Sequence, residues 1–252
     1  MLKNKLLAAA LASLFASPVL AEGFTPSANV SLVSNYLYRG ISQTGEGPAI
    51  QGGFDVAHAS GVYAGVWASS ISWLGDAGVP NAGAELDTYL GYKGTAGDVG
   101  YDIGYLRYNY PGEYAPGAVT ADTDEVYGAV SYSVVSVKLS YSLGDTFGVA
   151  DAKGTTYAEV NISYPVADSG VTLGAHYGMQ AYKGATADAL KAGGADPTYA
   201  DYKLSVTKDF SGYVLGLAYS STNAEKGAGE FYHVLGKDLG KGTAVLSLSR
   251  AM

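Results

Sequence analysis

The chain has no cysteine among its 252 residues, only three histidines, and no long apolar run beyond its N-terminal region. The lack of cysteine excludes a disulfide scaffold. No later segment reaches 18 uninterrupted apolar residues, so the sequence predicts no transmembrane helix. It also lacks a metal-ligand spacing, a Gly-x-Ser-x-Gly elbow and a phosphate loop, and therefore implies no metal site and no cofactor.

The N-terminus has the parts of a secretory signal peptide. Lys3 and Lys5 are basic, residues 6–16 are apolar except for Ser13, and Val19-Leu20-Ala21 forms a small-residue cleavage site. The apolar run is too short for a bilayer core, which needs about 20 residues. We predict a cleaved signal peptide over 1–21, export through the periplasm, and one mature domain over 22–252.

The mature chain is acidic. Without Lys3 and Lys5, 13 of the 15 basic residues remain against 23 acidic ones, a net charge of about −10. This charge disfavours a nucleic-acid partner.

A strict two-residue alternation runs through the mature chain, which is typical of strands with one apolar face. It is clearest over residues 135–142, where Val135, Val137, Leu139 and Tyr141 alternate with serine and lysine, and it returns over 158–164 and 171–177. The polar faces carry Gly, Ser and charge, while the apolar faces end in Tyr. Such strands suit a transmembrane β-barrel with lipid outside and water inside.

The connections between these strands alternate in length. Short ones are expected at 58–61, 94–98, near 134, 166–170 and 209–212, and long ones at 40–47, 70–84, 111–122, 144–154, 179–198 and 222–229. This sorting is typical of an all-β, up-and-down outer-membrane barrel with periplasmic turns and external loops. With a last strand near 242–250 we count about 12 antiparallel strands, and 14 is the alternative. Residues 185–192 could form a short helix that folds into the barrel mouth, or a disordered loop tip.

Outward tyrosines are expected in two girdles, one at each membrane interface. The girdle at the short-turn end comprises Tyr92, Tyr101, Tyr132, Tyr164 and Tyr213, and the other comprises Tyr36, Tyr38, Tyr105, Tyr141, Tyr177, Tyr202 and Tyr219.

Several blocks carry a resemblance to a known family: residues 35–44 (NYLYRGISQT), 48–55 (PAIQGGFD), 61–69 (GVYAGVWAS), 85–87, 91–92, 108–111 and 245–249. They resemble the Gcw_chp family, also called TorF-type porins. The resemblance implies the cell envelope of a Gram-negative bacterium and a channel, with no established substrate. Similar sequences tend to end in an aromatic residue, the cue for insertion by the barrel-assembly machinery, whereas this one ends Arg250-Ala251-Met252. Efficient assembly is therefore not implied.

Alternation also assigns the side chains that face the lumen. The candidates for the pore lining are Arg39, Gln51, Asp55, Glu85, Asp87, Asp102, Glu125, Lys138, Glu159, Asn161, His176, Asp201 and Lys203. Because acids outnumber bases, we expect weak cation selectivity. The alternative is that these charges pair across a narrow lumen and fill it. Arg39 is expected to pair with Asp55 or Asp87 as an interior brace, or else to contact an anionic solute.

Three functions remain to be compared. The first is a porin for passive diffusion of small hydrophilic solutes across the outer membrane. The second is a plugged barrel with a structural or surface-binding role. The third is a barrel enzyme, for which His176 with Ser163 or Glu159 is the only plausible site, and we favour no enzyme because an interior histidine more often makes structural hydrogen bonds. The expected partners are outer-membrane lipid, a small solute and the barrel-assembly machinery, with the protein as a monomer or weak homo-oligomer.

Overall fold

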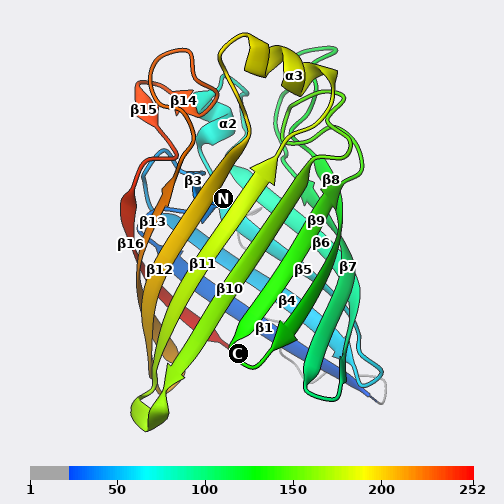
Figure 1. The fold of residues 1–252 in the computed structure, drawn as a ribbon, viewed down its shortest axis with the longest axis vertical. Coiled ribbons are helices and arrows are strands. Elements are labelled where there is room, and N and C mark those ends of the chain that lie inside the picture. The colour runs from blue at the N-terminus through cyan, green and yellow to red at the C-terminus, as the bar shows by residue number, and fades with distance from the viewer. Residues whose placement is uncertain (1–22) are drawn as a thin grey trace, which may run out of the picture.

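Twelve long antiparallel strands close into a barrel in the computed structural model, which describes residues 23–252 (Figure 1). The signal peptide predicted for 1–21 lies outside the described residues. The barrel strands are β1 (Phe24–Val33), β4 (Ala49–His58), β5 (Val62–Ser70), β6 (Ala84–Ala96), β7 (Val99–Asn109), β8 (Thr123–Tyr132), β9 (Val135–Ser142), β10 (Thr156–Val166), β11 (Val171–Ala181), β12 (Tyr199–Phe210), β13 (Tyr213–Thr222) and β16 (Thr243–Ala251).

The first and last strands close the barrel. β1 pairs with β16 from Asn29↔Ala251 to Val33↔Ser247 and with β4 along its whole length. Closure leaves no sheet edge, so the ladder bonds can satisfy the backbone polar groups without water. The expected twelve-stranded, up-and-down barrel is confirmed, and the alternative of fourteen strands is wrong.

The connections sort by length as expected. At one end, the short-turn end, the strands are joined by tight turns and by the 3₁₀ segment η1 (Ala167–Ser169). At the other, the long-loop end, the loops carry β2 (Leu37–Tyr38), β3 (Ile41–Ser42), α2 (Trp73–Asp76), α3 (Ala185–Ala192), β14 (His233–Val234) and β15 (Lys237–Asp238). In Figure 1 these elements gather at the upper end.

The alternation separates an apolar outer face from a polar inner face. Leu204 is 64% exposed, and Leu90 and Ile103 are also well exposed on the outside. Of the described helices, none is both long and apolar enough to cross a membrane. Large exposed apolar side chains on the outside of the strands are typical of a surface that faces lipid.

The outer tyrosines lie near both ends of the strands. Tyr132 and Tyr164 are exposed at the short-turn end, and Tyr177 and Tyr219 at the long-loop end. Two tyrosines expected in the girdle at the long-loop end do not belong to it. Tyr36 lies just before β2 and Tyr38 lies in β2, and because β2 folds inside the barrel both side chains are covered.

On the inner face, tyrosine rings lie flat over glycines of neighbouring strands. Tyr63 covers Gly91, Tyr89 covers Gly65, and Tyr127 covers Gly104. A side chain at any of these glycines would displace the ring, which is why glycine is found here in a strand interior.

We expect Gly91→Ala to lower the free energy of unfolding by about 1–3 kcal/mol, because overpacking forces side chains and backbone to shift. The added Cβ would meet the Tyr63 hydroxyl and lie 2.8 Å from the carbonyl oxygen of Ile103, which belongs to the paired strand and cannot move away easily. Urea titration of the refolded barrel measures the change. Gly128→Ala is the matched control, since a Cβ there meets nothing within 4 Å; an equal effect at both positions would contradict the packing argument.

The packed apolar core of the molecule sits at the long-loop end. Its largest cluster joins Tyr36, Ile71, Leu74, Tyr108 and Tyr110. The expected helix over 185–192 forms, as α3, but it lies at the outer tip of the loops (Figure 1), where Ala187 packs against Val149 and Tyr182. Neither alternative for this segment holds as stated, because it is an ordered helix rather than a disordered tip and does not fold into the mouth; a different segment enters the barrel.

Candidate functional site

The segment that enters the lumen is a small hairpin from the first long loop, β2–β3, which we call the inserted hairpin (residues 37–42). Its turn residues Arg39 and Gly40 have φ values of 48° and 79°, as in a two-residue turn with both central residues left-handed. A Cβ on Gly40 would lie 2.7 Å from Asp201 Cβ and from Thr222 Cγ2. The tip of the hairpin therefore lies against the inner wall at β12 and β13, and only glycine fits there.

Arg39 joins the hairpin tip to the other side of the barrel. Its Nη2 lies 2.8 and 3.0 Å from the carboxylate oxygens of Glu125 on β8, and its Nη1 donates to Gln180 Oε1 on β11 at 2.7 Å. The two charged side chains are 7% and 2% exposed. The guanidinium also lies 4.3 Å from the ring centroid of Tyr157 and 4.8 Å from that of Tyr38. An arginine presents five N–H donors in a plane, and these neighbours use both its edges and its faces.

The brace that was expected for Arg39 therefore exists with a different partner. Arg39 pairs with Glu125 instead of Asp55 or Asp87. The reason is that Arg39 does not project from a barrel strand: the hairpin carries it across the lumen to β8 and β11.

Below the hairpin lies a polar cavity of about 250 Å³ that includes Arg39, Lys138, Glu159, Asn161, His176, Asp201 and Lys203 in its lining. His176 is the centre of its hydrogen bonds. One ring nitrogen lies 2.7 Å from Asn161 Oδ1, and the other lies 2.9 Å from Asp201 Oδ1 and 3.0 Å from the Tyr157 hydroxyl. Glu159 Oε2 lies 3.6 Å from His176 Nδ1. Ser163 is paired with Gly174, whereas His176 is paired with Asn161. Of the two partners considered for His176, Glu159 is therefore its close neighbour, and Asn161 rather than Ser163 is paired with it across the two strands.

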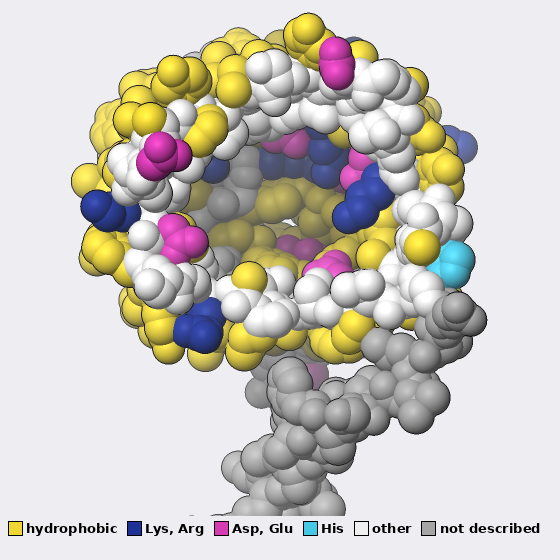
Figure 2. All heavy atoms as spheres, turned by 90° about the horizontal axis from the view of Figure 1, so that it is seen from below, with side chains coloured by type: hydrophobic (Ala, Val, Ile, Leu, Met, Phe, Trp, Pro, Cys, Tyr) yellow, Lys and Arg dark blue, Asp and Glu magenta, His cyan; other side chains and the backbone are white. Residues whose placement is uncertain are grey.

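Two lumen candidates, Asp55 on β4 and Asp102 on β7, line the opposite wall. Tyr89 donates to Asp55 at 2.6 Å and Tyr63 donates to Asp102 at 2.7 Å, so phenols hold both carboxylates in place. Lys138 lies 4.2 Å from the ring centroid of Tyr127. Figure 2, viewed from the short-turn end, shows the hollow mouth with acidic and basic side chains on its inner wall.

Two candidates nearer the long-loop end, Glu85 and Asp87, are covered, and Gln51 is half-buried. Glu85 and Asp87 are 1% and 7% exposed, and Tyr36 donates to Glu85 Oε1 at 3.2 Å. Gln51 lies beside Ser69, with 3.3 Å between amide and hydroxyl. The hairpin and the residue before it thus shield this part of the wall from the lumen.

Acids and bases are interspersed around the lumen. Lys93 on β6 is paired with Asp102 on β7, and Lys138 on β9 is paired with Glu159 on β10. On β12, Asp201 and Lys203 lie two residues apart and therefore share the inward face. The described residues contain no group of three or more His, Asp or Glu side chains placed to hold a metal ion.

Above the hairpin, the long loops enclose a second cavity, of about 180 Å³ and lined mostly by aromatic rings, which we call the aromatic pocket. Burial raises the pKa of Tyr182 and of Tyr232 well above the ordinary value, so both phenols stay neutral. The sequence analysis placed Tyr38 in an outward girdle and predicted neither this pocket nor the contacts of Tyr108, Tyr157 and Gln180 around Arg39. Tyr157 and Gln180 occupy inward positions of their strands, so the two-residue alternation could have assigned both side chains to the lumen.

A family model described as a bacterial protein of unknown function (Gcw_chp) matches residues 19–252. No curated protein is matched by the sequence. Among solved structures, the chain is similar to a KdgM porin, with 8% identity, a TM-score of 0.52, and coverage of 89% of this chain and 97% of that one. A NanC porin gives 8% identity, a TM-score of 0.50, and coverage of 90% and 98%. A KdgM porin in complex with disordered oligogalacturonate gives the same figures as NanC. At such low identity the likeness shows the shared barrel fold.

Proposed function

The chain belongs to the Gcw_chp family, and from this starting point we propose that it forms an outer-membrane channel for passive diffusion of small hydrophilic solutes. The observation that carries the proposal is the inner wall. Below the hairpin, Lys138 and Lys203 line the polar cavity, Asp55 and Asp102 are held by inward tyrosines, and the mouth at the short-turn end is hollow with charged side chains on its inner wall (Figure 2). Ionised side chains on an inner barrel wall need water around them, and barrels with more than about eight strands leave room for it.

We propose further that the channel is weakly cation-selective. Seven acids face inward against four bases; with the covered Glu85 and Asp87 and the buried Arg39–Glu125 pair set aside, four acids still face three bases, so the open lumen carries a negative potential that attracts cations. The acids are Asp55, Glu85, Asp87, Asp102, Glu125, Glu159 and Asp201, and the bases are Arg39, Lys93, Lys138 and Lys203. Oligogalacturonate, held by the KdgM porin, is a polyanion and does not suit such a lumen.

The test is single-channel conductance of the mature chain, refolded from Glu22 onward, in a planar bilayer under a KCl gradient. We expect discrete steps and a reversal potential that favours potassium. Asp55→Asn with Asp102→Asn should shift the reversal potential toward zero, because it removes two lumen charges. Asp188→Asn on exposed α3 is the control and should leave it unchanged. A reversal potential favouring chloride in the wild type would overturn the selectivity, and a folded barrel that never conducts would overturn the channel.

A specific observation favours a second candidate, the plugged barrel with a structural or surface-binding role. The Arg39–Glu125 ion pair and the contact of the hairpin tip with the wall are buried and cross the lumen. As long as the hairpin stays in place, these contacts close the passage. A silent wild-type barrel that conducts once the hairpin is removed would support this candidate over the open channel.

A further inference from the structure

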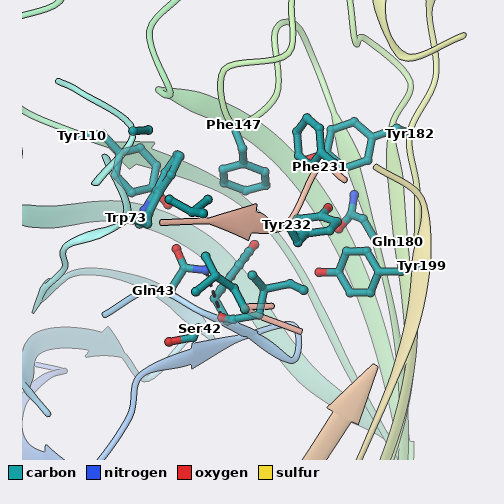
Figure 3. A pocket seen from close by; sticks show the side chains of 15 residues that line it. Ser42, Gln43, Trp73, Tyr110, Phe147, Gln180, Tyr182, Tyr199, Phe231 and Tyr232 are labelled. Atoms are coloured by element: carbon teal, nitrogen blue, oxygen red, sulfur yellow. Dashed lines mark hydrogen bonds between the residues drawn. The ribbon is translucent and has the colours of Figure 1, made fainter. Parts of the chain in front are cut away.

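The aromatic pocket is a separate site from the polar lumen. It lies between the inserted hairpin and the long loops, and eight of its fifteen lining residues are aromatic (Figure 3). Trp73, Phe147, Tyr182 and Phe231 come from four different loops. Rings contributed by so many segments form a preassembled apolar cavity, which is the usual form of a small-molecule site.

Two buried N–H donors in the lining of this pocket, on Gln180 and Trp73, lack a partner. Gln180 is 2% exposed, and its Oε1 accepts from Arg39 Nη1 at 2.7 Å. Because a guanidinium can only donate, this contact fixes the orientation of the amide and leaves Nε2 directed away from Arg39. Among residues 23–252, no hydrogen-bond acceptor meets Gln180 Nε2, and the same holds for Trp73 Nε1 in the same lining. A buried donor without a partner is costly, so a ligand that supplies an acceptor is favoured.

Several other polar groups of the pocket are already used. Ser42 Oγ donates to Asn35 Oδ1 at 2.7 Å, Gln43 Nε2 donates to the carbonyl oxygen of Ile41 at 3.1 Å, and the Tyr232 hydroxyl donates to the carbonyl oxygen of Pro197 at 2.8 Å. A sugar would bury several hydroxyls with too few partners, which is unfavourable. A cation would sit close to Arg39, whose guanidinium is over the Tyr38 ring.

The size and lining point to one planar ring. Apolar cavities of comparable size accept a benzene molecule, and aromatic rings make favourable edge-to-face and offset contacts with one another. We propose that the aromatic pocket binds a neutral monocyclic aromatic compound whose carbonyl substituent accepts a hydrogen bond from Gln180 Nε2. Binding at this site does not depend on whether the lumen conducts.

The test is calorimetric titration of benzamide into the refolded full-length mature barrel in detergent. The wild type should bind benzamide saturably with one site. Gln180→Glu keeps an acceptor for Arg39 and nearly the same shape but removes both N–H donors, so benzamide should bind about tenfold more weakly or worse. Gln51→Glu makes the same chemical change elsewhere on the wall and should leave the affinity unchanged.

Two further probes separate the contributions of ring and carbonyl. Cyclohexanecarboxamide keeps the carbonyl but loses the flat ring. Methyl glucoside represents the sugars, for which the pocket offers too few hydrogen-bond partners. Both should bind more weakly than benzamide. Absence of saturable benzamide binding in the wild type would overturn the proposal, as would equal affinity of the wild type and Gln180→Glu or tighter binding of methyl glucoside. Because the readout is binding to a folded barrel, a failure here leaves the conductance experiment unaffected.

Discussion

Arg39→Ala is expected to lower the free energy of unfolding by about 3–5 kcal/mol, because removing one partner of a buried ion pair leaves the other charge uncompensated. The substitution would strand Glu125, which is 2% exposed, and would also deprive Gln180 Oε1 of its donor. The rings of Tyr38 and Tyr157 would lose the guanidinium between them. The measurement is the urea midpoint of the refolded barrel, with the heat-modifiable band on a gel as a second readout.

Two variants show whether the effect belongs to the buried pair. Arg107→Ala removes an arginine that is 38% exposed and faces Asp122 and Asp124 on the outer rim, and exposed pairs of this kind contribute about 0–1 kcal/mol. Combining Arg39→Ala with Glu125→Gln should recover part of the loss, since the carboxylate no longer has to be buried as a charge. An unchanged midpoint for Arg39→Ala would show that Arg39 does not brace the barrel.

The barrel wall could be predicted from the sequence because its signal is local. The inward or outward direction of Leu139 or Lys138 follows from the position of each in a two-residue repeat, and the repeat persists through every strand. Loop lengths then fix which strand ends lie together, and closure requires an even number of strands if both termini lie at one end. Strand polarity therefore follows without knowledge of any long-range contact, and the strand count follows except for the C-terminal part, which left twelve and fourteen strands open.

The contacts inside the lumen could not be predicted in the same way. Tyr36, Tyr38 and Arg39 continue the alternation of β1, so they read as the end of a strand, whereas the chain turns at Arg39-Gly40 and folds back into the barrel. The partner of Arg39 is 86 residues away in sequence. Several acids face the lumen, and nothing in their local sequence distinguishes Glu125 from Asp55.

The sequence does contain a signal for the aromatic pocket, in the aromatic residues of its long loops. Trp73, Phe147, Phe231 and Tyr232 all fall in long loops, where isolated aromatic side chains would be exposed to water. Aromatic residues in several loops at one end of a barrel predict that these loops pack on one another. The orphaned donor of Gln180 could not be foreseen, because it exists only through the contact with Arg39.

Removal of the inserted hairpin is expected to increase single-channel conductance severalfold. Gln43 N donates to the carbonyl oxygen of Tyr36 at 2.8 Å, so the two ends of residues 37–42 already lie side by side, and two glycines can join them without strain. The deletion removes Arg39 and the tip that rests against Asp201 and Thr222. Water then reaches Glu125 and Gln180, and the passage between the polar cavity and the long-loop end widens.

Replacing residues 185–192 with a glycine–serine segment of equal length is the matched control for this deletion. It alters a long loop of the same end, but α3 lies at the outer tip and does not enter the lumen (Figure 1), so conductance should stay close to that of the wild type. Equal conductance of the wild type and the hairpin deletion would place the constriction elsewhere. Because Arg39 holds the hairpin to β8 and β11, Arg39→Ala should reproduce part of the increase, which ties the stability of the barrel and the width of its lumen to one side chain.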